Sequence, residues 1–212
     1  MLFNIAAHDL AALLSSKLCH DLISPVGAIN NGLELLEEGG ADADAMNLIK
    51  NSARTASARL QFARVAYGAA GSASVQIETG DARNVSLGFM SCEKGELVWD
   101  GPRYFLPKNK IKLLLNLVLI ANGSIPRGGG KISVLIEGDE ANPRFTLKTS
   151  GTMLRVPPRF LELYSGGPEH EPIDAHSIQP YYTLLLARES GMEIGVTVEP
   201  EEITFTAVQS SV

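Results

Sequence analysis

Two long helical patterns in residues 1–70 constrain the fold of this chain more than any other feature of its sequence. Between Ala7 and Glu38, apolar side chains recur at helical spacing and form one stripe, which comprises Leu14, Leu18, Leu22, Ile29, Leu33 and Leu36. Gly39 and Gly40 follow, and glycine is the residue that most often ends a helix. The pattern therefore predicts one long amphipathic helix that stops before residue 40.

A second helix is predicted from a cap at Asp42 or Asp44 to about Gly68. Its apolar positions alternate steps of three and four, as in a heptad repeat, and are Met46, Ile49, Ala53, Ala56, Leu60, Ala63 and Tyr67. The short connection makes the two helices an antiparallel hairpin, and one hairpin cannot bury both stripes. Pairing two hairpins gives a four-helix bundle, so we expect a homodimer. The alternative is that the hairpin packs on the rest of its own chain.

His20 lies in the first predicted helix and points nearly opposite to its apolar stripe, when side chains are placed at about 100° per residue. Its neighbours on the helix surface are small or polar, namely Ser16, Ser24, Gly27 and Asn31. An exposed histidine is usually just a solvated residue. Here, however, Asp21 stands beside it, and Pro25 removes a backbone donor one turn later. The adjacent carboxylate and the proline favour a functional site over a merely solvated histidine.

Nucleophilic catalysis and phosphoryl carriage are the chemistries that use such a group. Imidazole is largely neutral near pH 7, so a ring nitrogen can attack without a strong base. The carboxylate of Asp21 can orient the ring through its other nitrogen and stabilise the cationic form. We therefore predict His20 and Asp21 as the catalytic residues.

The segment His20–Pro25, followed by Ala28–Leu36, resembles the phosphoacceptor helix of two-component histidine kinases. It is closer still to the ChpT-type histidine phosphotransferases of alphaproteobacteria, in which a run of the form H-D-L-x-S-P-x-x-A-x-x-N-G-L-E-L-L is characteristic. The resemblance extends more weakly over the whole chain. It implies a histidine phosphotransferase that takes phosphate from the receiver domain of a hybrid kinase and passes it to cell-cycle response regulators.

Composition agrees with an ordinary globular chain of two small domains, since the 212 residues are 45% hydrophobic and 20% charged. A net charge of −6 argues against a nucleic-acid partner and against an anionic membrane. Cys19 and Cys92 form neither a disulfide framework nor a metal-ligand spacing. The N-terminus lacks a basic region, and the apolar run Ile111–Ala121 is too short to span a bilayer. We expect a cytoplasmic protein.

The pattern changes after the small-residue segment Gly68–Ser74, which predicts a linker between a helical domain at 1–70 and a second domain at 75–212. Beyond it, strands and helices are mixed, as in an α/β sandwich with helices on one face of a sheet. The predicted strands are Val75–Thr79, Glu96–Trp99, Lys131–Glu137, Arg144–Thr149, Met192–Val198 and Ile203–Val208, and the predicted helices are Ala82–Cys92, Asn109–Ala121, Arg159–Leu163 and Pro180–Glu189.

This order resembles the ATP-binding domain of histidine kinases, but its three nucleotide boxes are altered. In the Asn-rich box, Ile120 stands where the second asparagine would help to hold magnesium, and a branched aliphatic side chain cannot coordinate a hard cation. The segment Leu147–Met153 lacks the adenine-reading aspartate, and Ser177–Thr183 lacks the glycines that cradle phosphates. The domain is thus expected to be a degenerate one that binds no ATP.

Three other features are interpreted as structural. Gly128–Gly130 precedes a strand, so it lacks the helix N-terminus of a phosphate cradle. The metal-competent groups of Glu169–Glu171, Asp174 and His176 match no zinc spacing. A set of arginines on the second helix is interpreted as solvated charges: Arg54, Arg59 and Arg64.

Taken together, these features predict a phosphotransferase that needs no cofactor or metal of its own. His20 would attack the aspartyl phosphate of one receiver and pass the phosphoryl group to the aspartate of another. Catalysis would come mainly from positioning the reacting groups and neutralising their charge. The receiver would supply the Mg²⁺. Lys17 either neutralises phosphoryl oxygens or is simply solvated. The receiver is expected to dock on small residues of the same helix, which are Ser24, Gly27, Ala28 and Asn31.

Two other functions are compatible with the sequence. An active histidine kinase with unusual nucleotide boxes would bind ATP directly. A non-catalytic adaptor would block receivers through the bundle, keep its biological activity after His20→Ala, and never carry acid-labile phosphate.

Overall fold

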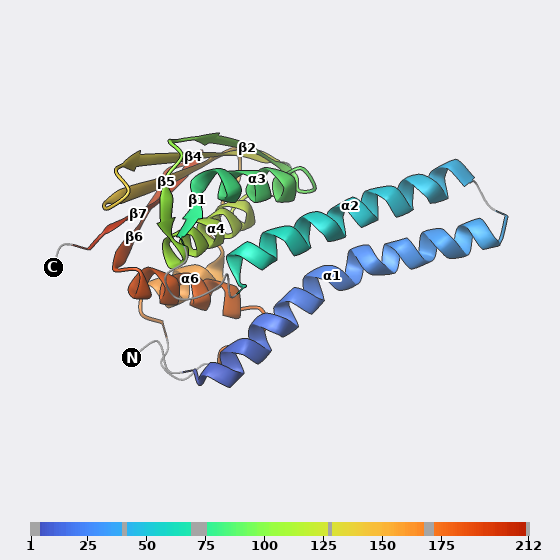
Figure 1. Cartoon of the computed structure of the whole chain (residues 1–212), viewed down its shortest axis with the longest axis horizontal. Helices are drawn as coiled ribbons and strands as arrows, with labels where there is room; N and C mark the ends of the chain where they lie inside the picture. The colour runs from blue at the N-terminus through green and yellow to red at the C-terminus, as the bar shows by residue number, and fades with distance from the viewer. Residues whose placement is uncertain (1–4, 40–41, 69–75, 127–128, 168–171, 211–212) are drawn as a thin grey trace.

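A long helical hairpin projects from an α/β domain in the computed structural model, which describes residues 5–39, 42–68, 76–126, 129–167 and 172–210 (Figure 1). The hairpin consists of α1 (Ala7–Glu37) and α2 (Asp42–Ala66), which confirms two helices with the predicted ends to within two residues. Pro25 lies inside α1, which is continuous through it. Apart from Gly68, the predicted linker Gly68–Ser74 lies outside the described part of the chain.

The α/β part alternates short strands and helices in the order β1, α3, β2, β3, α4, β4, β5, α5, α6, β6 and β7. Its helices are α3 (Thr79–Met90), α4 (Lys108–Gly123), α5 (Pro158–Tyr164) and α6 (Ile178–Glu189). Its strands are β1 (Gln76–Glu78), β2 (Gly95–Asp100), β3 (Phe105–Pro107), β4 (Gly130–Gly138), β5 (Pro143–Ser150), β6 (Met192–Val198) and β7 (Glu202–Gln209).

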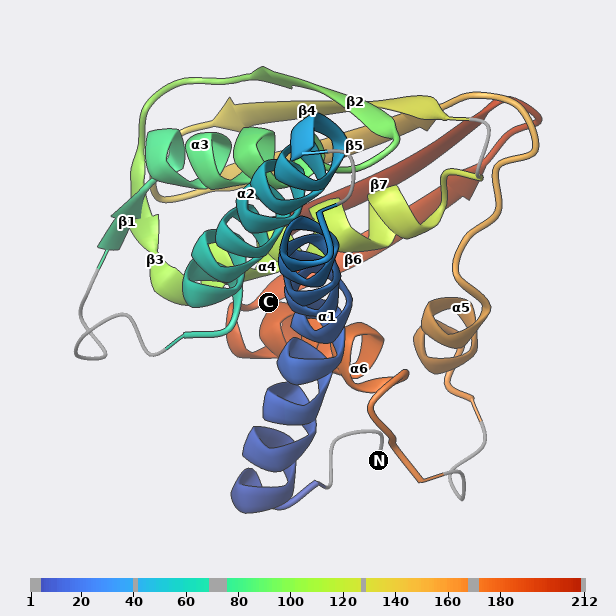
Figure 2. The same cartoon turned by 90° about the vertical axis from the view of Figure 1, so that its right-hand side faces the viewer.

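Five strands form a mixed sheet in the order β2-β4-β5-β7-β6, in which only the β2–β4 pair is parallel. Alternate residues of β4 and β5 are buried, so one face of the sheet carries the core and the other faces water. Helices α3, α4 and α6 lie on the covered face, between the sheet and the hairpin (Figures 1 and 2). This is the predicted helix-on-sheet sandwich.

Two predictions at the start of the domain were wrong. Thr79 was expected to end a strand, but it begins α3, and Val75 lies outside the described residues. The strand β3 was not predicted, and it pairs antiparallel with β1 in a separate two-stranded sheet. The side chain of Thr79 joins this corner, because its hydroxyl accepts a hydrogen bond from the Tyr104 amide at 3.0 Å and donates to the Pro102 carbonyl at 2.8 Å.

The hairpin and the α/β domain share one hydrophobic core. Phe62 and Ala66, near the end of α2, are 2% and 0% exposed and belong to the same buried cluster as α4 and the sheet. The Phe62 ring lies 4.7 Å, centroid to centroid, from the ring of Phe89 on α3. The alternative in which the hairpin packs on its own chain is therefore realised at the base of the hairpin. Among the described residues, no helix combines the length and apolarity required to cross a membrane.

Candidate phosphotransfer site

His20 occupies an exposed position halfway along α1, as its direction away from the apolar stripe predicted. Its side chain is 72% exposed. The Nδ1 atom lies 3.5 Å from Oδ1 of Asp21. With that nitrogen beside the carboxylate, Nε2 is the atom available to a reacting partner.

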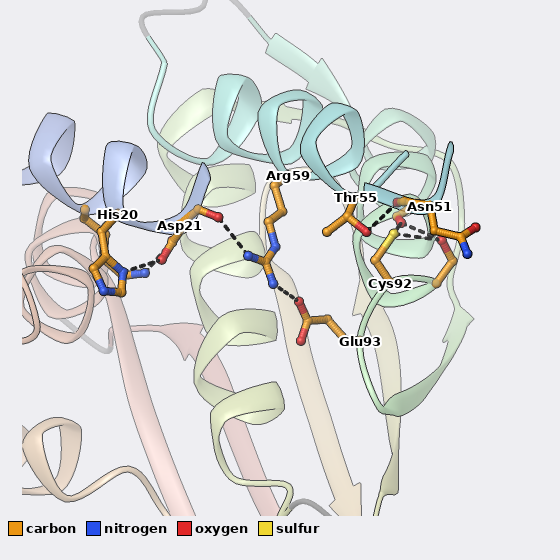
Figure 3. A network of polar contacts seen from close by, with 10 residues as sticks. His20, Asp21, Asn51, Thr55, Arg59, Cys92 and Glu93 are labelled. Atoms are coloured by element: carbon orange, nitrogen blue, oxygen red, sulfur yellow. Dashed lines mark hydrogen bonds and ion pairs between the residues drawn. The ribbon is translucent and has the colours of Figure 1, made fainter. Parts of the chain in front are cut away.

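Asp21 contacts His20 and Lys17 through its carboxylate and Arg59 through its backbone carbonyl, which places it at the centre of the site. Figure 3 shows the contacts with His20 and Arg59. One carboxylate oxygen faces His20 and the other forms an ion pair with Lys17, one turn earlier on α1. The side chain of Lys17 is therefore paired with Asp21 in the described structure. Burial raises the pKa of the Tyr67 phenol above its ordinary value, and the charge of Asp21 adds to this effect.

Pro25 creates a specific gap in the helix at Asp21. Because proline has no backbone N–H, it cannot donate to the carbonyl of the residue four positions earlier, which is Asp21. Arg59 from α2 fills the gap, and its guanidinium donates to the Asp21 carbonyl oxygen at 2.8 Å. The same guanidinium forms a 3.1 Å ion pair with Glu93, which follows α3 (Figure 3). The interpretation of Arg59 as a solvated charge was therefore wrong.

The predicted docking residues lie together on the exposed side of α1. Ser24 and Asn31 are exposed, whereas Gly27 and Ala28 are half-buried. The sequence reasoning missed Ile23, a large apolar side chain that is 72% exposed one turn after His20. Its position in the sequence, i+3 from the histidine, was the signal that could have identified it.

His176 also reaches the site, although it belongs to the α/β domain. It stands in the turn that precedes α6, and its ring centroid lies 6.0 Å from that of His20, with an interplanar angle of 77°. Both residues are exposed. From the sequence, His176 was interpreted as part of a loop whose metal-competent groups match no zinc spacing. Its neighbours in that prediction, residues 169–171, lie outside the described part of the chain.

The side chains at the first nucleotide box are buried and contact other parts of the fold. Asn116 is fully buried, and its amide donates to the carbonyl of Ala66 at 3.3 Å and to that of Lys112 at 2.9 Å. Gln179 on α6 donates to Oδ1 of Asn116 at 3.2 Å. Ile120 is 1% exposed within the core. The polar groups of this region thus join α2, α4 and α6 to one another.

In the part of the chain that the structure describes, no group of three or more His, Cys, Asp or Glu residues is placed to hold a metal ion.

Burial lowers the pKa of the Lys112 ammonium, and neighbouring Lys108 lowers it further. Lys112 lies against the end of α2, where its Nζ is 3.5 Å from the Tyr67 carbonyl oxygen.

Comparison with known proteins identifies the family of the chain. Residues 79–202 match the family described as histidine phosphotransferase C-terminal domain. The chain is 65% identical over 204 residues to protein phosphotransferase ChpT of Brucella abortus (strain 2308), which covers 96% of this chain and 97% of that protein. It also superposes on a solved bacterial phosphotransferase with a TM-score of 0.93 and 62% identity, over 98% of this chain and 99% of the other. An exposed histidine beside a carboxylate on a helical hairpin, joined to this α/β domain, thus belongs to a phosphorelay protein: the chain is a member of the ChpT family of histidine phosphotransferases.

Proposed function

We propose that His20 is the residue that carries the phosphoryl group, and that it does so between receiver-domain aspartates without a nucleotide. The observation that carries this assignment is the exposed His20 ring, held beside Asp21 with Nε2 turned away from the carboxylate. The other described histidines differ in their surroundings. His8 has Asp9 beside it but no cationic partner on that carboxylate, and His176 has no carboxylate ion pair.

The proposed transfer is a substitution at phosphorus. The lone pair on Nε2 of neutral His20 forms a bond to the phosphorus of an aspartyl phosphate, and the P–O bond to the aspartate breaks, leaving a carboxylate. The imidazole is then cationic, and the carboxylate of Asp21 stabilises the N–H at Nδ1. Attack by the aspartate of a second receiver reverses these steps and restores neutral His20. In this proposal Mg²⁺ belongs to the receivers.

The exposed strip of α1 after His20 is proposed as the receiver dock. Ser24, Gly27, Ala28 and Asn31 are small or short side chains that let a helix of the receiver approach closely. Ile23 adds an apolar contact at the edge of this strip. A dock with few charged groups and a limited area suits partners that bind, react and leave.

Dimerisation through the hairpin is supported by a groove between α1 and α2 that the chain itself leaves open. The groove has a volume of about 610 Å³, and its walls include Leu14, Leu18, Leu60, Ala63 and Tyr67. These residues belong to the two predicted apolar stripes. Leu60, Leu33 and Met46 remain 48%, 47% and 40% exposed. A second hairpin from an identical chain would cover them and complete a four-helix bundle, in a protein that we place in the cytoplasm.

Internal use of the nucleotide-box residues supports the absence of ATP binding. Asn116 is committed to Ala66 and Gln179, and Ile120 offers no ligand oxygen. The cavity beside them, between the hairpin and the α/β domain, has a volume of about 240 Å³. Ligand pockets for drug-sized molecules usually span about 300–1,000 Å³. These observations favour a phosphotransferase over an autokinase.

One labelling experiment separates the three functions. A receiver domain carrying radiolabelled aspartyl phosphate is mixed with the wild-type protein, and a second receiver is then added. We expect acid-labile label on the wild-type chain, its passage to the second receiver, and loss of both in His20→Ala. His8→Ala is the matched control and should behave as wild type, because it removes the other exposed histidine of α1 that adjoins an aspartate.

The other outcomes identify the rival functions. Label that appears from ATP alone would establish an autokinase. A chain that binds receivers but never becomes labelled would be an adaptor. Label that persists in His20→Ala would show that another residue accepts the group.

A further inference from the structure

We propose that His176 is a second functional histidine, which holds the phosphoryl group on His20 by donating a hydrogen bond to one of its oxygens. The inference rests on the proposed role of His20 and adds to it a residue from the α/β domain. The chain would then build its phosphotransfer site from both of its parts.

The two histidines face each other across the junction between α1 and the turn before α6. Their ring centroids are 6.0 Å apart and their planes meet at 77°, so the edge of one ring is directed at the face of the other. Charge-assisted N–H···O hydrogen bonds are about 2.7–2.9 Å long, so a phosphoryl group bound to His20 lies within reach of the neighbouring ring. The open surroundings of both side chains leave room for that group.

The turn that carries His176 is tightly fixed. Oδ1 of Asp174 accepts hydrogen bonds from the backbone N–H of His176 at 3.0 Å, from that of Ser177 at 2.8 Å, and from the Ser177 hydroxyl at 2.7 Å. These bonds hold the pKa of the Asp174 carboxyl below its ordinary value. Gln179, two residues after Ser177, donates a hydrogen bond to Asn116 of α4, so the turn is anchored to the core. A ring on such a support is held in place before the phosphoryl group arrives.

The other cations near His20 are already engaged. Lys17 is paired with Asp21, and Arg59 is shared between the Asp21 carbonyl and Glu93. Among the described residues, the side chain of His176 contacts the His20 ring and has no hydrogen-bond partner of its own. It is therefore the group that can turn an N–H toward new negative charge without breaking an existing bond.

This donor would act during the substitution itself. As Nε2 of His20 bonds to phosphorus and the aspartate of the receiver leaves, the three remaining phosphoryl oxygens carry the negative charge of a loose transition state. A hydrogen bond from His176 to one of them stabilises that charge and orients the group in line. His176 keeps its proton, and the atoms exchanged between the receiver and His20 are unchanged.

The test compares two replacements of His176 under single-turnover conditions. Transfer of labelled phosphate from the receiver to His20 is followed at increasing receiver concentration, so that the saturating rate constant is separated from the half-saturating concentration. A hydrogen bond to a charged group is worth about 1.5–3 kcal/mol, so His176→Phe, which keeps a ring but removes the donor, should lower the saturating rate constant about 10- to 100-fold. His176→Arg supplies a cationic donor and should recover most of the loss. His8→Phe is the control for removing an exposed histidine and should have no effect.

The alternatives give different results. If His176→Phe transfers as fast as wild type, or if His176→Arg is as slow as His176→Phe, the histidine donates no catalytic hydrogen bond and the inference is wrong. A change confined to the half-saturating concentration would make His176 a receiver contact, which also overturns the inference. Label that survives in His20→Ala would instead contradict the proposed function on which the inference rests.

Discussion

At the scale of single residues, Pro25 determines more than the course of one helix. It deprives the Asp21 carbonyl of its helical donor, and the guanidinium of Arg59 takes that place. Arg59 then extends to Glu93, so a single side chain links the phosphoacceptor helix, α2 and the α/β domain. A proline inside a helix normally costs stability, and here the exposed backbone oxygen becomes an anchoring point.

Replacing Arg59 should therefore weaken the fold. Arg59→Met leaves the Asp21 carbonyl and the Glu93 carboxylate without their partner, which we expect to cost about 1–3 kcal/mol. Thermal unfolding followed by circular dichroism should show a midpoint lower by about 2–12 °C, given about 2–4 °C per kcal/mol for chains of this size. Arg54→Met, on the same helix at an exposed position, is the control and should leave the midpoint within about 1 °C. Equal midpoints for the two variants would refute the anchoring role.

The distance between partners in the sequence decided which site residues could be predicted. The orientation of His20 depends only on the periodicity of α1, and Asp21 adjoins it, so both follow from local geometry. Arg59 bonds to a residue 38 positions away, and His176 meets His20 only after the whole α/β domain has folded. Helical periodicity gives no information on such contacts. For this reason the sequence predicted the exposed position of His20 and missed Arg59 and His176, which lie near it.

At the scale of elements, the hairpin depends on close approach of α1 and α2 at Gly32. A Cβ atom added there would lie 2.6 Å from Cγ1 of Ile49 and 3.2 Å from the carbonyl oxygen of Ala45. Both distances are shorter than an ordinary van der Waals contact, so the helices would have to separate. At Gly27, on the same helix, an added Cβ meets nothing within 4 Å.

These two glycines form a matched pair for a stability measurement. Gly32→Ala should destabilise the chain by about 1–3 kcal/mol through overpacking. Gly27→Ala should stabilise it by up to about 1 kcal/mol, because alanine is the better helix former. Urea unfolding of the two variants measures both changes with one method. Similar midpoints, or a reversed order, would show that the α1–α2 contact is looser than described.

Elements with a strong hydrophobic period were predictable, whereas the strand β3 was not. The strands β4, β5, β6 and β7 were expected because their apolar residues alternate. The strand β3 has only three residues and forms by pairing with β1, so it is too short to show a periodic hydrophobic pattern. Helix α6 begins two residues before the predicted start, because Asp174 and Ser177 organise the preceding turn. Turn bonding of this kind is not visible in hydropathy.

At the scale of the whole molecule, the hairpin has two different environments. Its base shares the core of the α/β domain through Phe62 and Ala66. At the same end of the hairpin, the groove lined by Leu60 and Tyr67 remains open, and this is where a second chain is proposed to bind. The sequence correctly indicated unburied apolar stripes, but it did not show that one end of α2 would be covered by the chain's own domain.

A charge in the groove should prevent this association. Leu60 is 48% exposed, so Leu60→Glu introduces little strain into a single chain but places a carboxylate in the proposed interface. Light scattering coupled to size-exclusion chromatography should show a dimer for the wild type and a monomer for this variant. Leu48→Glu is the control, since Leu48 is 37% exposed on the same helix and lies off the groove. A wild-type chain that is monomeric at micromolar concentration would contradict the proposal.

The bonds of Asn116 to Ala66 and to Gln179 have a kinetic consequence. These bonds fix α2 to the α/β domain, so in the proposed relay the hairpin that carries His20 does not swing between a donor and an acceptor, and the two receivers must bind in turn. Donor and acceptor receivers then compete for one binding surface, and the donor must dissociate before the acceptor can bind. Turnover should follow a ping-pong scheme, in which an excess of the unphosphorylated donor slows delivery to the acceptor.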